Sequence, residues 1–160
     1  MKRAPLLAVL VLAAAVLPGC YATKFTGGGQ ITSGSNFSAG KASARSAGGS
    51  ANYGFTYDAV KGNLAGTYRD GDVAMSLTGN PTFDYYSDGD ENCMSADGNY
   101  RSTNPRQRGD GTLHIYACDN GEGRGSYDYL EVQVNSGPFE GYSNSGYTRG
   151  NLQAHKSTGL

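Results

Sequence analysis

Three carboxylate residues gather around one glycine-rich turn in the middle of the chain. Asp119, Glu122 and Asp128 lie within the segment 112–134, TLHIYACDNGEGRGSYDYLEVQV, which has the pattern of two strands joined by a tight turn. Oxygen ligands on an open turn suit a hard cation such as Ca²⁺, which takes about six to eight of them. The alternative is that the side chains of Asp119 and Asn120 bond the backbone of the turn and the rest is solvated. We expect no cofactor, with calcium at this turn as the one exception to test.

A second acidic stretch begins like an EF-hand loop and then departs from it. In residues 88–99, DGDENCMSADGN, Cys93 stands where the loop needs glycine, and the twelfth residue is Asn99 where the loop needs glutamate. The stretch is therefore not predicted to be an EF-hand. A weaker oxygen site built from Asp88, Asp90 and Asp97 stays open.

The sequence nominates no catalytic residue. A serine triad needs a serine beside one of the two histidines, His114 or His155, and a carboxylate behind it. No serine lies in a G-x-S-x-G elbow, and no pair of carboxylates is singled out for glycoside hydrolysis. We therefore predict that the protein is not an enzyme, with a small cell-envelope hydrolase as the alternative.

Several tyrosines fall outside the predicted core positions and are candidates for ligand binding. Tyr85, Tyr86 and Tyr142, together with Tyr147, lie near asparagine and serine. Exposed tyrosine offers a rigid amphipathic surface to a sugar or a protein. The chain has no tryptophan, which counts against a typical carbohydrate-binding surface. The alternative is that these tyrosines are ordinary strand residues.

The N-terminus carries an export signal. Lys2 and Arg3 precede the apolar run Leu6 to Leu17, which has the length of a signal-peptide core and is too short to span a bilayer. The run ends in LPGC, residues 17–20, which resembles the lipobox that directs lipid attachment to Cys20. The alternative is ordinary cleavage after Ala22. Both place the mature chain outside the cytoplasm, either anchored to the cell membrane or secreted.

Two further cysteines predict a disulfide. Once Cys20 is lipidated or removed, Cys93 and Cys118 remain as an even pair in an oxidising compartment. Because no CxxC motif is present, we do not expect a structural zinc site. We expect a Cys93–Cys118 bridge.

Charge and composition restrict the class of protein. The formal net charge is −1, and loss of Lys2 and Arg3 takes it to about −3. Because there is no basic stripe, nucleic acid is not an expected partner. The 25 glycines and 12 tyrosines favour short strands and tight turns over helix.

Alternating apolar and polar residues predict a single all-β domain over residues 25–156, after a signal peptide at 1–20 and a short tether at 21–24. We expect little or no helix and an antiparallel meander that closes into a sandwich or barrel. A Ser/Ala/Gly-rich loop, residues 34–50, interrupts it. Gly79-Asn80-Pro81 is expected to break one strand, and residues 101–111 to form a polar loop. The expected strands are 25–33, 53–57, 64–68, 73–77, 82–86, 112–118, 130–134 and 147–155.

Several pieces of the sequence together resemble a known family. They are Gly27-Gly28-Gly29-Gln30-Ile31, the stretches 51–55 and 62–68, Asp119-Asn120-Gly121-Glu122-Gly123 followed by Asp128, and residues 150–155, GNLQAH. This set resembles a domain of secreted bacterial proteins, mainly of high-GC Gram-positives, with a GGGxI opening, a DNGEPGxxDxFxI hairpin and a GGNIxxH closing strand. Arg149 replaces the first glycine of the closing motif. The resemblance implies a β-rich extracellular module and no assigned activity.

From the sequence we therefore expect an exported, lipid-anchored, non-catalytic β-module that binds an extracellular ligand or protein or has a structural role. Beside the hydrolase, a calcium-stabilised module that binds carbohydrate or protein is the other alternative.

Overall fold

The computed structural model of the protein describes residues 22–32, 49–83, 92–121 and 127–156. In these residues every regular element is a strand, and none is a helix, which confirms the all-β prediction. The strands are β1 (Ala22–Thr32), β2 (Ser50–Asp58), β3 (Asn63–Asp70), β4 (Val73–Phe83), β5 (Cys93–Ser102), β6 (Asp110–Cys118), β7 (Tyr129–Val134) and β8 (Ser143–Lys156).

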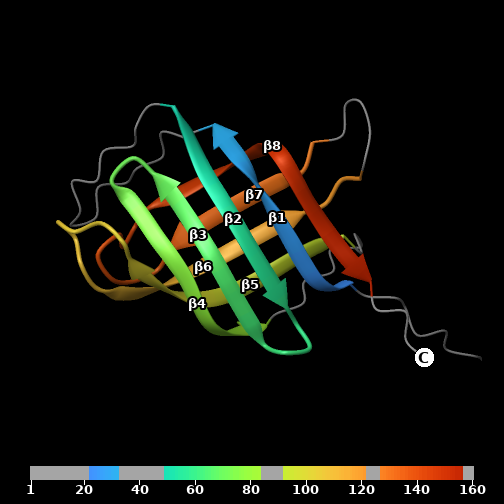
Figure 1. Ribbon diagram of the computed structural model, residues 1–160, viewed down its shortest axis with the longest axis horizontal. Helices are drawn as coiled ribbons and strands as arrows, with labels where there is room; N and C mark the ends of the chain where they lie inside the picture. The colour runs from blue at the N-terminus through green and yellow to red at the C-terminus, as the bar shows by residue number, and fades with distance from the viewer. Residues whose placement is uncertain (1–21, 33–48, 84–91, 122–126, 157–160) are drawn as a thin grey trace, which may run out of the picture.

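The strands form a closed antiparallel barrel in simple sequence order (Figure 1). Each strand pairs with the next one along the chain, and β8 returns to pair with β1 from Phe25↔Ala154 to Ile31↔Thr148. The sequence pattern left a sandwich and a barrel open, because alternation predicts a buried face for each strand without saying which strands meet. The last pairing decides in favour of the barrel.

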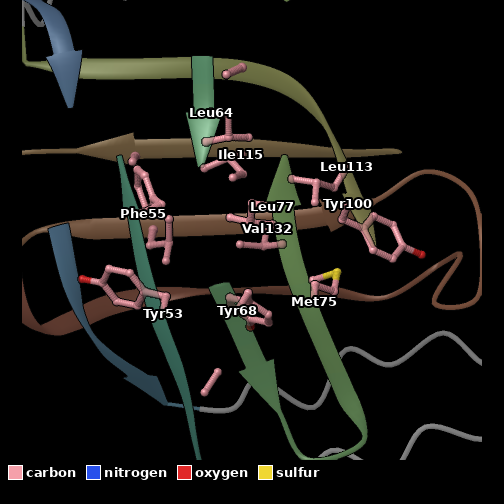
Figure 2. Close-up of a cluster of buried hydrophobic side chains, with 14 of the residues drawn as sticks. Tyr53, Phe55, Leu64, Tyr68, Met75, Leu77, Tyr100, Leu113, Ile115 and Val132 are labelled. Atoms are coloured by element: carbon pink, nitrogen blue, oxygen red, sulfur yellow. The ribbon is translucent and has the colours of Figure 1, made fainter. Parts of the chain in front are cut away.

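Apolar side chains fill the interior of the barrel. Alternate residues of each strand point inward, and Leu64, Leu113 and Ile115 are at most 1% exposed. Figure 2 shows these side chains facing one another from strands on opposite walls. Packing of this kind is the main source of stability in a domain of this size.

Glycines let β1 and β8 approach each other closely. Gly29 pairs with Gly150 across the two strands. A Cβ atom on Gly150 would lie 2.6 Å from the Cα of Gly29, closer than a side chain tolerates. The opening glycine triplet and the closing glycine therefore serve the seam that closes the barrel.

Two of the predicted boundaries are wrong. The break expected at 79–81 does not end a strand: β4 continues to Phe83, and the irregularity is a shift of register against β5 between Thr78 and Thr82. In β5 a strand is present where none is expected, because the sequence pattern places its residues in the acidic stretch 88–99 and the polar loop 101–111. Its inward positions include Ala96 and Gly98, which are too small to give an apolar signal.

Candidate functional site

The acidic turn caps an uncovered edge of β8. Strand β7 pairs with β8 only from Ser143 to Tyr147, whereas β8 continues to Lys156. Beyond that point, the Leu152 N–H donates to Asp128 Oδ2 at 2.7 Å, and the Ala154 N–H donates to Asp119 Oδ2 at 2.9 Å. Buried backbone donors need acceptors. The two carboxylates supply them along the part of β8 that lies beyond Tyr129, the first residue of β7.

The other two oxygens of these carboxylates hold the turn itself. Asp128 Oδ1 accepts from the Asn120 N–H at 3.1 Å, and Asp119 Oδ1 accepts from the Gly121 N–H at 2.9 Å. Hydrogen bonds to a charged acceptor are stronger than those between neutral groups. All four oxygens thus accept a backbone proton, and the turn is tied to the strand that closes the barrel.

The calcium prediction rests on Glu122, Asp119 and Asp128. Glu122 lies outside the described residues. Within the described residues, no group of three or more His, Cys, Asp or Glu side chains is placed to hold a metal ion. Because backbone N–H groups already bond Asp119 and Asp128, the structure offers a reason for these carboxylates that needs no ion.

The disulfide joins two neighbouring strands. Cys93 begins β5 and Cys118 ends β6, and the two residues are direct partners in the ladder. This confirms the predicted pairing. Cys20, the predicted lipidation site, lies outside the described residues.

A serine, a histidine and an aspartate meet on the outer face of β5 and β6. His114 Nδ1 lies 2.8 Å from Asp97 Oδ1, and His114 Nε2 lies 3.2 Å from the Ser95 hydroxyl. An aspartate on Nδ1 orients the ring so that Nε2 can accept the hydroxyl proton, which is the connectivity of a serine triad. The His114 side chain is 32% exposed and the Asp97 side chain 56%.

This cluster was not predicted from the sequence, although the disulfide between Cys93 and Cys118 would have given the register of the two strands. Cys93 pairs with Cys118, so counting four residues inward along each strand pairs Asp97 with His114. Counting two residues from Cys93 reaches Ser95 on the same face, because side chains alternate along a strand. The other histidine, His155, contacts the hydroxyl of Thr26 at 2.8 Å across β1 and β8.

Among the predicted ligand-binding tyrosines, the structure describes Tyr142 and Tyr147. Tyr85 and Tyr86 lie outside the described residues. Tyr142 is 1% exposed and points into the barrel, so it offers no outer surface to a ligand. The prediction that Tyr142 is exposed is therefore wrong. Tyr142 lies just before β8, and the segment between β7 and β8 places its side chain inside the barrel.

Tyr142 belongs to a buried polar cluster. Its hydroxyl donates to Asp70 Oδ2 at 2.8 Å and lies 2.6 Å from the hydroxyl of Tyr68, which accepts from Asn144 Nδ2 at 3.0 Å. Burial, reinforced for Tyr142 by the adjacent Tyr68 and Asp70, raises the pKa of both phenols. These hydrogen bonds satisfy polar groups that would otherwise be costly inside an apolar core.

A different set of tyrosines forms a cluster on the outside of β6, β7 and β8. We call Tyr116, Tyr127, Tyr129 and Tyr147 the tyrosine surface. The rings of Tyr129 and Tyr147 have centroids 5.9 Å apart, and Tyr116 and Tyr127 extend the group on either side at 6.2 and 6.4 Å. Tyr127 is 59% exposed and Tyr147 is 67% exposed. Of the four, only Tyr147 was singled out from sequence.

Comparisons with known proteins return no relative: no protein-family model, no curated protein and no solved structure matches the chain. In its described part there is also no helix of the length and apolarity needed to cross a membrane.

Proposed function

We propose that the protein is an exported, lipid-anchored, non-catalytic β-module that binds an extracellular ligand through the tyrosine surface. The observation that carries the proposal is the exposure of Tyr127 and Tyr147, whose rings contact each other, while Tyr147 also contacts Tyr129. Linked rings give a rigid contact area that loses little conformational entropy on binding.

The filled interior supports a surface function. Side chains occupy the centre of the barrel, where Leu113, Ile115 and Val132 pack together (Figure 2). Barrels that carry small molecules keep a cavity there. A ligand of this protein therefore binds to the outer wall or to the loops.

The proposal of export and anchoring is supported by the signal-like sequence that ends at Cys20. The resemblance to the β-domain family with the GGGxI, acidic-hairpin and closing motifs supports an extracellular module. The mass of the intact, membrane-extracted protein tests the anchor. A mass that includes acyl chains on Cys20 is expected, and a mass that matches cleavage after Ala22 contradicts anchoring.

Binding is tested with delipidated bacterial cell envelopes as the probe. The retained fraction of the wild-type protein is compared with that of a Tyr127→Ala, Tyr147→Ala variant. We expect the variant to lose most of its retention, whereas a matched Gln133→Ala change on the same wall keeps it. Equal retention of all three proteins, or no retention of the wild type, overturns the tyrosine surface as the binding site.

A small cell-envelope hydrolase is the second candidate, and the Ser95–His114–Asp97 contacts favour it. In an ester hydrolysis, Ser95 Oγ would attack the carbonyl carbon while its proton passes to His114 Nε2. That proton would then go to the leaving alkoxide, and water would release the acyl group from Ser95. The hydroxyl and the imidazole are within reach of each other, but they lie on a strand face beside Tyr116 and not in a described hollow.

A fluorophosphonate probe separates the two candidates, because it reacts only with an activated serine. The module predicts no labelling of the wild type beyond that of Ser95→Ala. Labelling that disappears both in Ser95→Ala and in His114→Ala, with the fold retained by circular dichroism, would establish the hydrolase.

A further inference from the structure

One end of the barrel carries two adjoining hollows lined by arginine. The first, of about 350 Å³, includes Arg101, Arg108 and Asp110. The second, of about 330 Å³, includes Arg69, Arg106 and Asp72. Residues 103–105 of the β5–β6 loop line both hollows. We call the pair the arginine hollow.

The charge of this region is opposite to that of the whole chain. Of the five arginines in the described residues, only Arg149 lies elsewhere. Four arginines against two aspartates leave a local charge of +2, whereas the chain as a whole carries −1. Clustered charge of one sign around a concave surface attracts ligands of the other sign.

Within the described residues, only one of the four arginines has a carboxylate partner. Arg101 Nε donates to Asp110 Oδ1 at 2.8 Å, and this bond lowers the pKa of the Asp110 carboxyl, which stays ionised. Arg69, Arg106 and Arg108 are exposed, and no described ion pair engages them. Their guanidinium groups remain open to bidentate contacts with an external anion.

Hydrogen bonds hold the loop between the hollows in place. Asn104 Nδ2 donates to the carbonyl of Asp72 at 2.8 Å, which joins the β5–β6 loop to the β3–β4 turn. Asn104 Oδ1 accepts from the Arg106 N–H at 2.9 Å, and the Thr103 N–H donates to the carbonyl of Ala74 at 2.8 Å. A backbone fixed before binding reduces the entropy that a ligand must overcome.

From these observations we propose that the arginine hollow binds an anionic polymer that carries closely spaced phosphate or carboxylate groups. The two hollows share the residues 103–105, so neighbouring anionic groups of one chain can reach Arg108 on one side and Arg69 and Arg106 on the other. The site is separate from the tyrosine surface, which lies on β6 to β8.

The strand order places the arginine hollow away from the N-terminus. In a barrel of antiparallel neighbours, the β3–β4 turn and the β5–β6 loop lie at the end where β1 finishes. The chain enters β1 at Ala22, two residues after Cys20, at the opposite end. This orientation, unlike the binding itself, rests on the proposed function: with a lipid on Cys20, the hollow faces away from the membrane.

The test uses fluorescently labelled linear polyphosphate and polygalacturonate as anionic probes, and dextran as a neutral one. Binding to the full chain is followed by fluorescence anisotropy at two ionic strengths. We expect the wild type to bind at least one anionic polymer, to weaken as salt rises, and to ignore dextran. The preferred polymer identifies the anionic group.

Charge reversal then locates the site. Arg106→Glu with Arg108→Glu is expected to reduce affinity at least about tenfold and to lower the salt dependence. Arg149→Glu, an equivalent exposed change on β8, is expected to alter affinity less than about twofold. Both variants should keep the circular dichroism spectrum of the wild type, because the altered side chains are exposed.

Three results overturn the proposal: no binding of either anionic polymer, equal binding of dextran, or an Arg149→Glu loss per charge as large as that of the loop variant. Loss of retention on cell envelopes in the tyrosine variant tests a different surface. Either proposal can therefore fail without the other.

Discussion

Removing the Asp128 carboxylate should destabilise the barrel where β8 is least covered. Asp128 is 7% exposed, and its two oxygens accept the N–H groups of Leu152 and Asn120. In Asp128→Ala, the Leu152 N–H loses its acceptor in a buried position, which costs about 1–3 kcal/mol. The Asn120 N–H is more exposed, so water replaces its bond at a cost of about 0.5–1.5 kcal/mol. The expected total is about 1.5–4.5 kcal/mol, a substantial part of the stability of a domain.

Urea unfolding, followed by far-ultraviolet circular dichroism, measures this loss. Asp72→Ala serves as the control, because Asp72 is exposed and its contact to Asn104 uses the backbone carbonyl. The control should change stability by less than about 0.5 kcal/mol. Hydrogen exchange gives a local readout: the Leu152 amide should exchange faster in Asp128→Ala even under conditions where the protein stays folded.

The reasoning is refuted if Asp128→Ala loses no more stability than Asp72→Ala, or if the exchange rate of the Leu152 amide is unaffected.

A melting experiment with a chelator tests whether calcium binds at the same turn. With backbone donors on Asp119 and Asp128, we expect a chelator to leave the melting temperature of the wild type unchanged. A clear fall with chelator that calcium restores would show that an ion contributes to the turn.

Three further predictions concern stability. Cys93→Ser with Cys118→Ser should cost about 3.5 kcal/mol by the chain-entropy estimate for the 25-residue separation, measured as a lower urea midpoint under oxidising conditions; an unchanged midpoint contradicts it. The raised pKa values of Tyr68 and Tyr142 mean that the folded state holds protons that the unfolded state releases near pH 10, so stability is retained below that pH and falls above it. Absorbance at alkaline pH should show these two phenols ionising only as the protein unfolds, and a reversible titration of every tyrosine near pH 10 in the folded protein is the opposing result. Gly150→Ala should lower the free energy of unfolding by about 1–3 kcal/mol because its Cβ meets β1, and an unaltered urea midpoint would show that the seam has room.

The fold class could be predicted because alternation is a local signal. Leu113, Ile115 and Leu130 occupy the inward positions that their spacing indicates, and Leu152 is fully buried in the closing strand as expected. Closure could not be predicted in the same way. It depends on the pairing of β1 with β8, whose residues are more than a hundred positions apart and are matched by glycines that carry no hydrophobic pattern.

The candidate sites could be predicted only in part, because their geometry also depends on contacts between residues far apart in the sequence. The aspartates at 119 and 128 were identified, but their partners are backbone N–H groups of β8, which no side-chain pattern reveals. Tyr142 and Tyr147 look alike in sequence, yet the first faces the core and the second faces outward. The arginines of the hollow come from two different hairpins, Arg69 from β3 and the others from β5 and the loop that follows it, and only the folded barrel brings them together.

The carboxylates on β8 also bear on how copies of the protein behave beside one another. A closed barrel avoids the open strand edges through which chains join into larger sheets. Past Tyr147, β8 would offer such an edge, because the Leu152 and Ala154 N–H groups lie beyond Tyr129, where β7 begins. Asp128 and Asp119 occupy those donors with negative charge, which another strand cannot displace without leaving the charges unpaired. The turn that caps this edge of β8 thus also blocks it as a place where a strand of another copy could pair.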